Sequence, residues 1–208
     1  MHGTAPLQDT APEARRRMIV RQARNRFASK GYSGTKMELV AREAGVSTAT
    51  LYALFSGKAE LFEAVIDDAA DDFANQMAGI GTLDGETRAS LTEVGMAYAD
   101  FMSDPFVRGV FRMVMAERTR FQPVALRFFE RGRVVFGASL IGILERLSRA
   151  GELGTIAHPS WAAGHLMGMI EHPVFFVPLV TGDEVHVRRS NSQIVADAIE
   201  TFLARYGT

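Results

Sequence analysis

The chain of 208 residues contains no cysteine, which excludes disulfide bonds and thiolate metal sites. It also lacks an uninterrupted apolar run of about 18 residues, so we expect no membrane span. Residues 1–12 do not combine a charged segment with an apolar one, which is the pattern of a secretory signal. We therefore expect residues 1–12 to be a disordered lead-in and the protein to be cytoplasmic.

Motifs for catalysis and cofactor binding are missing as well. There is no glycine-rich phosphate loop and no G-x-S-x-G element. His158, His165 and His172 recur every seven residues, whereas two metal ligands on one helix favour i, i+4 spacing. Glu117 with His165 is the one acid and base pair that could serve an enzyme. We predict no metal site, no cofactor and no enzymatic activity.

Charge is unevenly distributed, although the formal net charge is only −1. Residues 1–60 hold 10 Lys and Arg against 5 Asp and Glu, and residues 61–208 hold 13 against 19. A basic N-terminal quarter on an acidic body indicates that the two parts meet different partners, unless the imbalance is a chance property of the surface.

The apolar residues follow helical spacing, and strand signals are nearly absent. Capping boxes at residues 10–13 and 35–38 predict two helix starts, and the first helix should end before Gly31. Pro173 should kink or break a later apolar helix. The later helices are expected over about 58–73, 87–103, 105–119, 123–150, 159–180 and 190–206, with a glycine-rich break at 79–85. The prediction is an all-α protein, with a small bundle over 13–58 and a larger helical domain over 59–208.

Residues 44–55 have the pattern of a helix-turn-helix. Gly45 suits the turn because glycine tolerates a positive φ, and Ser47 should cap a helix that runs to about Phe55. Its inward face is Val46, Leu51 and Phe55, so Thr48, Ala49, Tyr52 and Ala53 should point outward, as DNA reading requires. A helical hairpin without a ligand is the alternative.

These residues resemble the N-terminal domain of TetR-type transcriptional regulators. The similarity runs without gaps over about residues 15–65 and rests on Phe27, Gly31-Tyr32, Thr35, Val40-Ala41, Ala44-Gly45-Val46-Ser47, Thr50-Leu51-Tyr52, Phe55, Lys58 and Leu61-Phe62. The resemblance implies an all-helical homodimer whose C-terminal domain binds a small molecule and releases DNA.

By position, the resemblance implies a set of DNA contacts. Thr50 and Tyr52 would touch phosphates, and Thr48 and Ala49 would touch base edges. Many relatives carry a basic residue in place of Thr48 and His or Tyr in place of Leu54, so specificity could depend on Lys36, apolar contacts or DNA shape. The full set is Thr35, Lys36, Ser47, Thr48, Ala49, Thr50, Tyr52 and Lys58.

The C-terminal part is similar to the subgroup named for AefR, through Arg112, Glu117, Arg120-Phe121, Phe129, Gly151-Glu152-Leu153 and Ala162-Ala163. Large aromatic and methionine side chains recur there, which is typical both of core and of adaptable apolar pockets. Candidate ligand contacts are Phe101, Phe111, Met115, Phe128, Trp161 and His165.

The predicted function is a homodimeric DNA-binding repressor that a small, largely apolar ligand releases from its operator. The helices over about 161–180 and 193–206 should form the dimer, since their apolar surface needs a partner. A DNA-binding regulator without an effector is the alternative.

Overall fold

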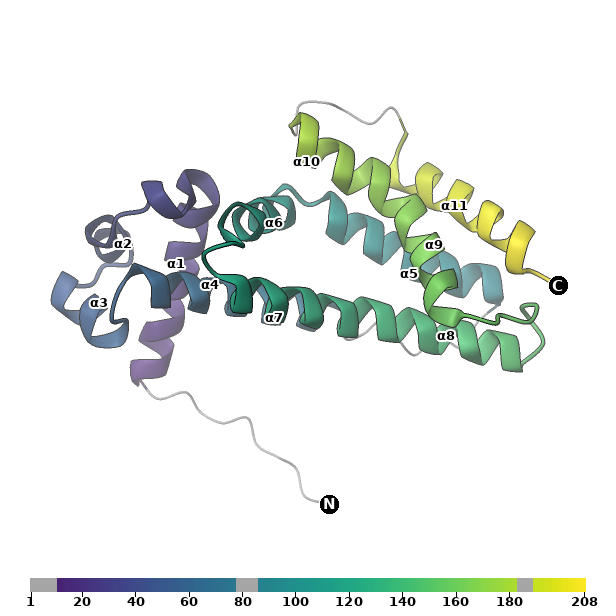
Figure 1. The fold of residues 1–208 in the computed structure, drawn as a ribbon, viewed down its shortest axis with the longest axis horizontal. Coiled ribbons are helices and arrows are strands. Elements are labelled where there is room, and N and C mark those ends of the chain that lie inside the picture. The colour runs from purple at the N-terminus through teal and green to yellow at the C-terminus, as the bar shows by residue number, and fades with distance from the viewer. Residues whose placement is uncertain (1–10, 78–85, 183–188) are drawn as a thin grey trace, which may run out of the picture.

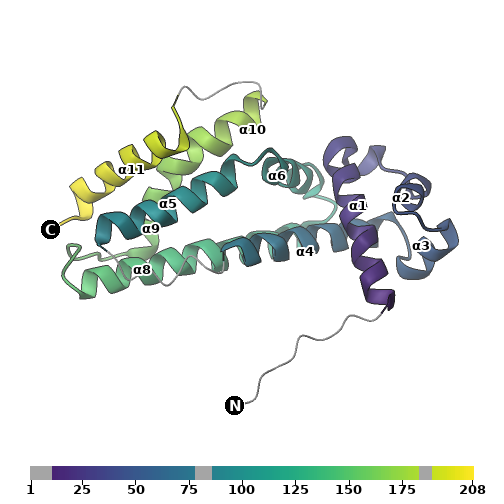
Figure 2. The same cartoon turned by 180° about the vertical axis from the view of Figure 1, so that it is seen from behind.

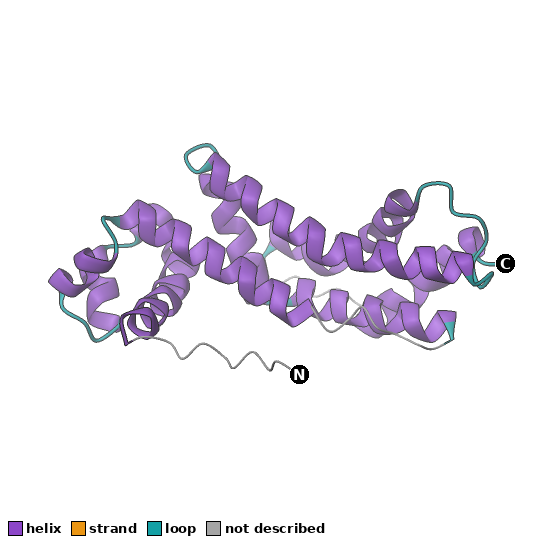
Figure 3. Ribbon diagram, turned by 90° about the horizontal axis from the view of Figure 1, so that it is seen from below, coloured by secondary structure: helices purple, strands orange, loops and turns teal. Residues whose placement is uncertain are grey.

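The computed structural model describes residues 11–77, 86–182 and 189–208. Within these ranges the chain is helical and forms no β-sheet, which confirms the predicted all-α class (Figure 3). Residues 1–10 of the predicted lead-in, the glycine-rich break and part of the first capping box lie outside the described residues. The predicted lead-in is wrong at residues 11 and 12, because the first helix already begins at Ala11.

The N-terminal group consists of α1 (Ala11–Gly34), α2 (Met37–Glu43) and α3 (Thr48–Leu54). Gly31 interrupts the helical backbone of α1 with a φ of 68°, so the predicted end of the helix is correct. Gly45 has a φ of 65° and makes the turn between α2 and α3. Of the predicted inward face, Leu51 and Phe55 are buried and Val46 is half-buried. The core of this group also contains Ile19, Ala23, Phe27 and Val40.

The predicted capping box at residues 35–38 is wrong. Lys36 occupies the N-cap of α2 and makes no side-chain cap hydrogen bond. Thr35 instead donates its hydroxyl proton to the carbonyl oxygen of Gly31, at 2.8 Å. The break at Gly31 leaves that carbonyl oxygen available, and the threonine hydroxyl satisfies it.

Helix α4 (Lys58–Met77) connects the N-terminal group to the rest of the molecule. It packs against α1 at one end and against α7 (Gln122–Gly132) along its length. Leu61, Val65 and Phe73 of this helix are buried. One helix therefore belongs to both parts of the fold.

The C-terminal part begins with α5 (Thr87–Ser103) and α6 (Pro105–Glu117). After them α7, the π-helical segment η1 (Arg133–Gly137) and α8 (Ala138–Arg149) follow without a break and correspond to the single helix expected over 123–150. A π-helical turn holds one extra residue, and such turns often occur at functional sites.

The apolar helix near the C-terminus is α9 (Pro159–Glu171), and it continues through the π-helical segment η2 (His172–Phe176) into α10 (Val177–Thr181). Pro173 was expected to kink or break this helix. It lies in η2 instead, where a wider turn accommodates the missing N–H group and the bulk of the ring. Helix α11 (Asn191–Tyr206) follows, and Ser190 with Gln193 forms a capping box at its start.

By length and composition alone, the helix over Pro159–Thr181 could cross a membrane. In its most apolar stretch, 33% of the residues are buried inside the protein. This finding differs from the expectation that no segment could span a membrane. The segment has this composition because its apolar residues occupy both the core-facing and the exposed sides of the helix.

Figures 1 and 2 show how these helices are arranged. Helices α1–α3 lie at one end, and the C-terminus lies at the opposite end beside α5 and α8. Helix α4 runs from the first group along α7. The fold thus places the helix-turn-helix at one end and joins it by α4 to a bundle of longer helices.

Candidate functional site

Helix α3 presents a surface of small and polar residues at the end of the molecule. Ser47 caps it by accepting a hydrogen bond from the backbone N–H of Thr50 at 3.0 Å. Leu51 and Phe55 are buried, so the opposite face points to solvent. On that face Ser47, Thr48, Ala49, Tyr52 and Ala53 are exposed, and Tyr52 retains 47% of its accessible surface. The predicted outward face of the helix is confirmed.

Three further residues of the predicted DNA-contact set lie beside this helix in different environments. Lys36 is exposed at the start of α2. Thr35 is buried, with only 1% of its surface exposed. Lys58 is half-buried: its Nζ donates to the carbonyl oxygen of Thr35 at 3.1 Å and lies 4.5 Å from the centre of the Tyr32 ring. Lys36 and the outward face of α3 therefore remain the accessible part of the set.

A cluster of aromatic rings joins the N-terminal group to the C-terminal part. Phe62 of α4 lies 5.3 Å from Tyr32 and 4.8 Å from Phe121, which precedes α7. Arg120 lies over the Tyr32 ring at 4.5 Å. Both halves of the molecule therefore contact the first turns of α4 through packed aromatic rings.

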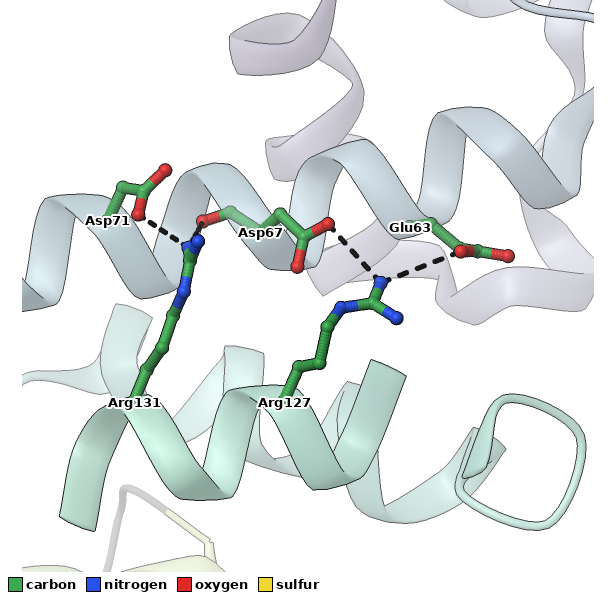
Figure 4. A network of polar contacts seen from close by, with 5 residues as sticks. All are labelled: Glu63, Asp67, Asp71, Arg127 and Arg131. Carbon is green, nitrogen blue, oxygen red and sulfur yellow. Dashed lines mark hydrogen bonds and ion pairs between the residues drawn. The ribbon is translucent and has the colours of Figure 1, made fainter. Parts of the chain in front are cut away.

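A row of carboxylates on α4 faces two arginines of α7 (Figure 4). Arg127 lies 3.3 Å from Asp67 and 3.6 Å from Glu63, and Arg131 contacts Asp71 at 2.5 Å and the backbone carbonyl of Asp67 at 3.3 Å. Hydrogen bonding to Asp67 raises the pKa of the Arg127 guanidinium. The i, i+4 spacing on each helix aligns the charges into a ladder. We call these five residues the α4–α7 ladder.

A second acidic row on α4 faces α1. Arg24 lies 2.6 Å from Asp72 and 3.3 Å from Asp68. Burial raises the pKa of the Asp68 carboxyl, and the nearby Arg24 charge opposes that shift. Helix α4 therefore has charge contacts with α1 of the N-terminal group on one side and with α7 of the C-terminal part on the other.

A cavity of about 780 Å³ lies in the C-terminal part, between α4, α5, α6, α7, η1, α8 and α9. Four of the six predicted ligand contacts line it: Phe101, Phe111, Met115 and Phe128. The rings of Phe111 and Phe128 pack edge to face, with 5.1 Å between their centres. Phe73 and Phe136 line it too, so α4 and η1 contribute directly to its wall. A concave, mostly apolar space of this size is typical of a small-molecule site.

The other two predicted contacts do not line the cavity. Trp161 is 66% exposed and packs on His158, with ring centres 4.5 Å apart. His165 is exposed, and its Nδ1 lies 2.8 Å from the Tyr206 hydroxyl of α11. Their neighbours Ser160, Ala163, Gly164 and Met167 face the cavity instead. Helical geometry therefore turns Trp161 and His165 toward the outer side of α9.

The polar pair of the cavity was not predicted. Tyr98 of α5 is buried and donates its hydroxyl proton to Oε2 of Glu171 in α9, at 2.8 Å. Burial, followed by the adjacent carboxylate, raises the pKa of Tyr98 above its ordinary value. The two residues are far apart in the sequence, and no spacing rule would have paired them.

Two family models match the chain. Residues 19–65 match the model described as bacterial regulatory proteins of the tetR family, and residues 89–208 match the C-terminal domain of AefR-like transcriptional repressors. No curated protein matches the sequence.

Solved structures with the same fold include a protein of Mesorhizobium loti assigned to the TetR family of transcriptional regulators. It is 26% identical, with a TM-score of 0.79, and the match covers 96% of this chain and 100% of that one. The flavonoid-responsive regulator FrrA is 24% identical, with a TM-score of 0.74 and coverage of 93% and 97%. The regulator FadR of Bacillus subtilis, solved with stearoyl-CoA, is 17% identical, with a TM-score of 0.68 and coverage of 90% and 97%.

Proposed function

The chain belongs to the TetR family of transcriptional regulators, and we propose that it is a cytoplasmic homodimeric repressor released from its operator by a small, largely apolar ligand. Family members are soluble DNA-binding proteins and not enzymes, so the prediction of no enzymatic activity is confirmed. The observation that carries the proposal is the position of α4, which lines the cavity with Phe73 and packs against the helix-turn-helix group.

For DNA binding we propose that α3 enters the major groove with Thr48 and Ala49 toward base edges and Tyr52 toward a phosphate. The exposure of these residues supports this orientation. Thr35 has a supporting role in this proposal: its hydroxyl bonds to Gly31 and its carbonyl accepts from Lys58, which fixes the start of α2 against α4.

For the dimer we propose that the exposed sides of α9, α10 and α11 pair about a two-fold axis. Trp161, Phe176 and Val180 are all more than half exposed, although they are large and apolar. A second copy would cover this surface, and it would supply the second recognition helix that an operator with two half-sites requires. The same pairing accounts for the membrane-like composition of residues 159–181.

The mechanism we propose is a coupling between the cavity and the spacing of the two recognition helices. A ligand that fills the cavity favours one position of α4 relative to α7 and α6. The aromatic cluster and Arg24 carry that change to α1, and the half-site spacing no longer fits the operator. The names of two relatives, one flavonoid-responsive and one solved with stearoyl-CoA, support a small-molecule effector with a sizeable apolar part.

Two measurements test the proposal together. Mobility-shift assays should find salt-sensitive, specific binding to DNA that flanks the gene of this protein. A thermal-shift panel of apolar compounds should find ligands that stabilise the fold and dissociate the complex. Specific DNA binding that no stabilising ligand changes would favour a regulator without an effector.

Tyr52→Phe and Thr48→Ala should weaken DNA binding in different ways. Loss of the Tyr52 hydroxyl should reduce affinity about tenfold on every operator variant, because a hydrogen bond to a charged phosphate is lost. Thr48→Ala should change the preference among variants at one or two base pairs. Titrations against a set of single-base operator variants distinguish the two, and equal, sequence-independent losses would remove Thr48 from base reading.

Arg131→Met should weaken the release of DNA by an effector. Its effect on the separate affinities for DNA and for the effector should be smaller. The methionine keeps an apolar stem on the cavity wall but loses both contacts with α4. Exposed ion pairs contribute at most about 1 kcal/mol to stability, so folding should hardly change. We expect the ratio of DNA affinities without and with effector to fall about fivefold.

Arg127→Met is the matched control, because Arg127 belongs to the α4–α7 ladder but does not line the cavity. It should reduce the ratio less than Arg131→Met does. If the ratio of DNA affinities without and with effector is the same in both variants and in the unmodified protein, the ladder does not couple the cavity to DNA binding.

A further inference from the structure

The polar groups of the cavity differ in charge and in exposure. Tyr98 is buried and Glu171 is half-buried, whereas Arg118 and Arg131 are exposed. Charges that face water are screened, while charges in an apolar surrounding act strongly on a ligand. The carboxylate of Glu171 is therefore the charge that most affects what binds inside.

The Tyr98–Glu171 pair offers acceptor atoms and no free proton. A phenol has a single O–H, and that of Tyr98 points to Oε2 of Glu171. Among the side chains that the structure describes, Tyr98 is the hydrogen-bond partner of this carboxylate and no cation pairs with it. A carboxylate that is partly withdrawn from water and has only a phenol partner favours a ligand that brings positive charge.

Aromatic rings surround the same place. Phe136 of η1 lies 5.1 Å from the Tyr98 ring and 5.0 Å from the Phe101 ring, and Phe73 of α4 lies 4.8 Å from Phe101. Aromatic faces attract cations through their quadrupole, and the attraction is stronger where water is excluded. Rings next to a carboxylate are the combination that recognises a bulky organic cation.

The arginines do not reverse this preference. Arg131 already binds the carboxylate of Asp71 and the carbonyl of Asp67 on α4. Arg118 is exposed at the end of α6, so an anion could reach it only where water competes. An anion placed beside Glu171 would meet like charge in an apolar surrounding.

We propose that the cavity selects aromatic organic cations, with the positive group of the ligand beside Glu171 and its rings among Phe101 and Phe136. This inference rests on the proposed function, because it names the chemical class of the effector. It adds that charge, and not only size and apolarity, decides which molecules bind.

Tetraphenylphosphonium and tetraphenylborate test this directly, since they have nearly the same size and shape and opposite charges. Titration calorimetry of the full chain without DNA should give at least tenfold tighter binding of the phosphonium. Glu171→Gln should weaken phosphonium binding at least tenfold and leave borate binding unchanged or stronger. Glu93→Gln, an exposed position on α5, is the matched control and should change neither.

Three results would overturn the inference: no phosphonium binding, borate binding that is equal or tighter, or unchanged phosphonium affinity in Glu171→Gln. If Glu171→Gln does not fold, the comparison of the two ions in the unmodified protein decides. Tyr98→Phe keeps the carboxylate and should keep the preference for the cation.

Adding the operator separates this inference from the proposed function. Phosphonium that binds the protein but leaves the DNA complex intact would support the ligand class and contradict ligand-driven release. Release by an anionic or neutral compound, with no binding of the phosphonium, would support the proposed function and contradict the inference.

Discussion

Replacement of Leu51 by alanine should abolish specific DNA binding while the cavity keeps its ligand. Leu51 is completely buried at the centre of α3 and anchors it on the N-terminal group. A buried leucine truncated to alanine costs about 3 kcal/mol, because apolar contacts are lost and a cavity remains. Helix α3 has only seven residues, and a helix this short is not stable without its packing. Its outward face would therefore no longer be held in one orientation.

The measurement is a mobility-shift titration combined with calorimetry of a cavity ligand. We expect DNA affinity to fall at least a hundredfold and ligand affinity to change less than threefold, because the cavity is built by α4–α9. Leu126→Ala is the control, since Leu126 is exposed on α7 and should tolerate the same truncation. DNA binding that survives Leu51→Ala would show that α3 does not depend on this anchor.

The helix-turn-helix could be predicted from the sequence because its determinants are local. Gly45 makes the turn, Ser47 caps the next helix, and the spacing of Leu51 and Phe55 separates the inward from the outward face. Each of these rules acts within four residues along the chain. The same local reasoning placed Thr35 in a cap, but the break at Gly31 offered its hydroxyl another acceptor.

The cavity could be predicted only in part, because its wall depends on packing between distant helices. Residue type identified Phe101, Phe111, Met115 and Phe128 as candidates, because large aromatic and methionine side chains suit an adaptable apolar pocket, and all four line the cavity. The composition of α9 drew attention to Trp161, although that residue lies on the outer side of its helix. A hydrophobic pattern shows that a helix has apolar faces, but it does not show which of two faces meets the cavity.

Long-range polar contacts were the least predictable part. The pairing of Tyr98 with Glu171 and the α4–α7 ladder join residues about 60 to 75 positions apart. The two charge patterns of the ladder are visible in the sequence, since Glu63, Asp67 and Asp71 are spaced four residues apart and so are Arg127 and Arg131. This spacing predicts two charged helix faces, but only the fold shows that they face each other.

Arg108→Met should lower the free energy of unfolding by about 3 kcal/mol, because buried carbonyl oxygens would lose a charged donor. Arg108 is 5% exposed on α6. It donates to the carbonyl oxygens of Met102 and Ser103 at the end of α5, at 3.4 and 2.5 Å, and to that of Val174 in η2 at 3.3 Å. Carbonyls at a helix end lack partners within the helix, and buried acceptors that lose a charged donor remain unsatisfied.

Arg108 therefore ties α5, α6 and η2 together behind the cavity wall, where Phe175 of η2 packs on Phe111 at 4.8 Å. Urea unfolding should show the loss for Arg108→Met and a smaller one for Arg108→Lys, which keeps the charge but cannot reach all three carbonyls. Arg149→Met, at an exposed position on α8, should stay within about 0.5 kcal/mol. If Arg108→Met proves as stable as Arg149→Met, the three carbonyls must find other donors, and the guanidinium does not hold the π-helical segment against the cavity.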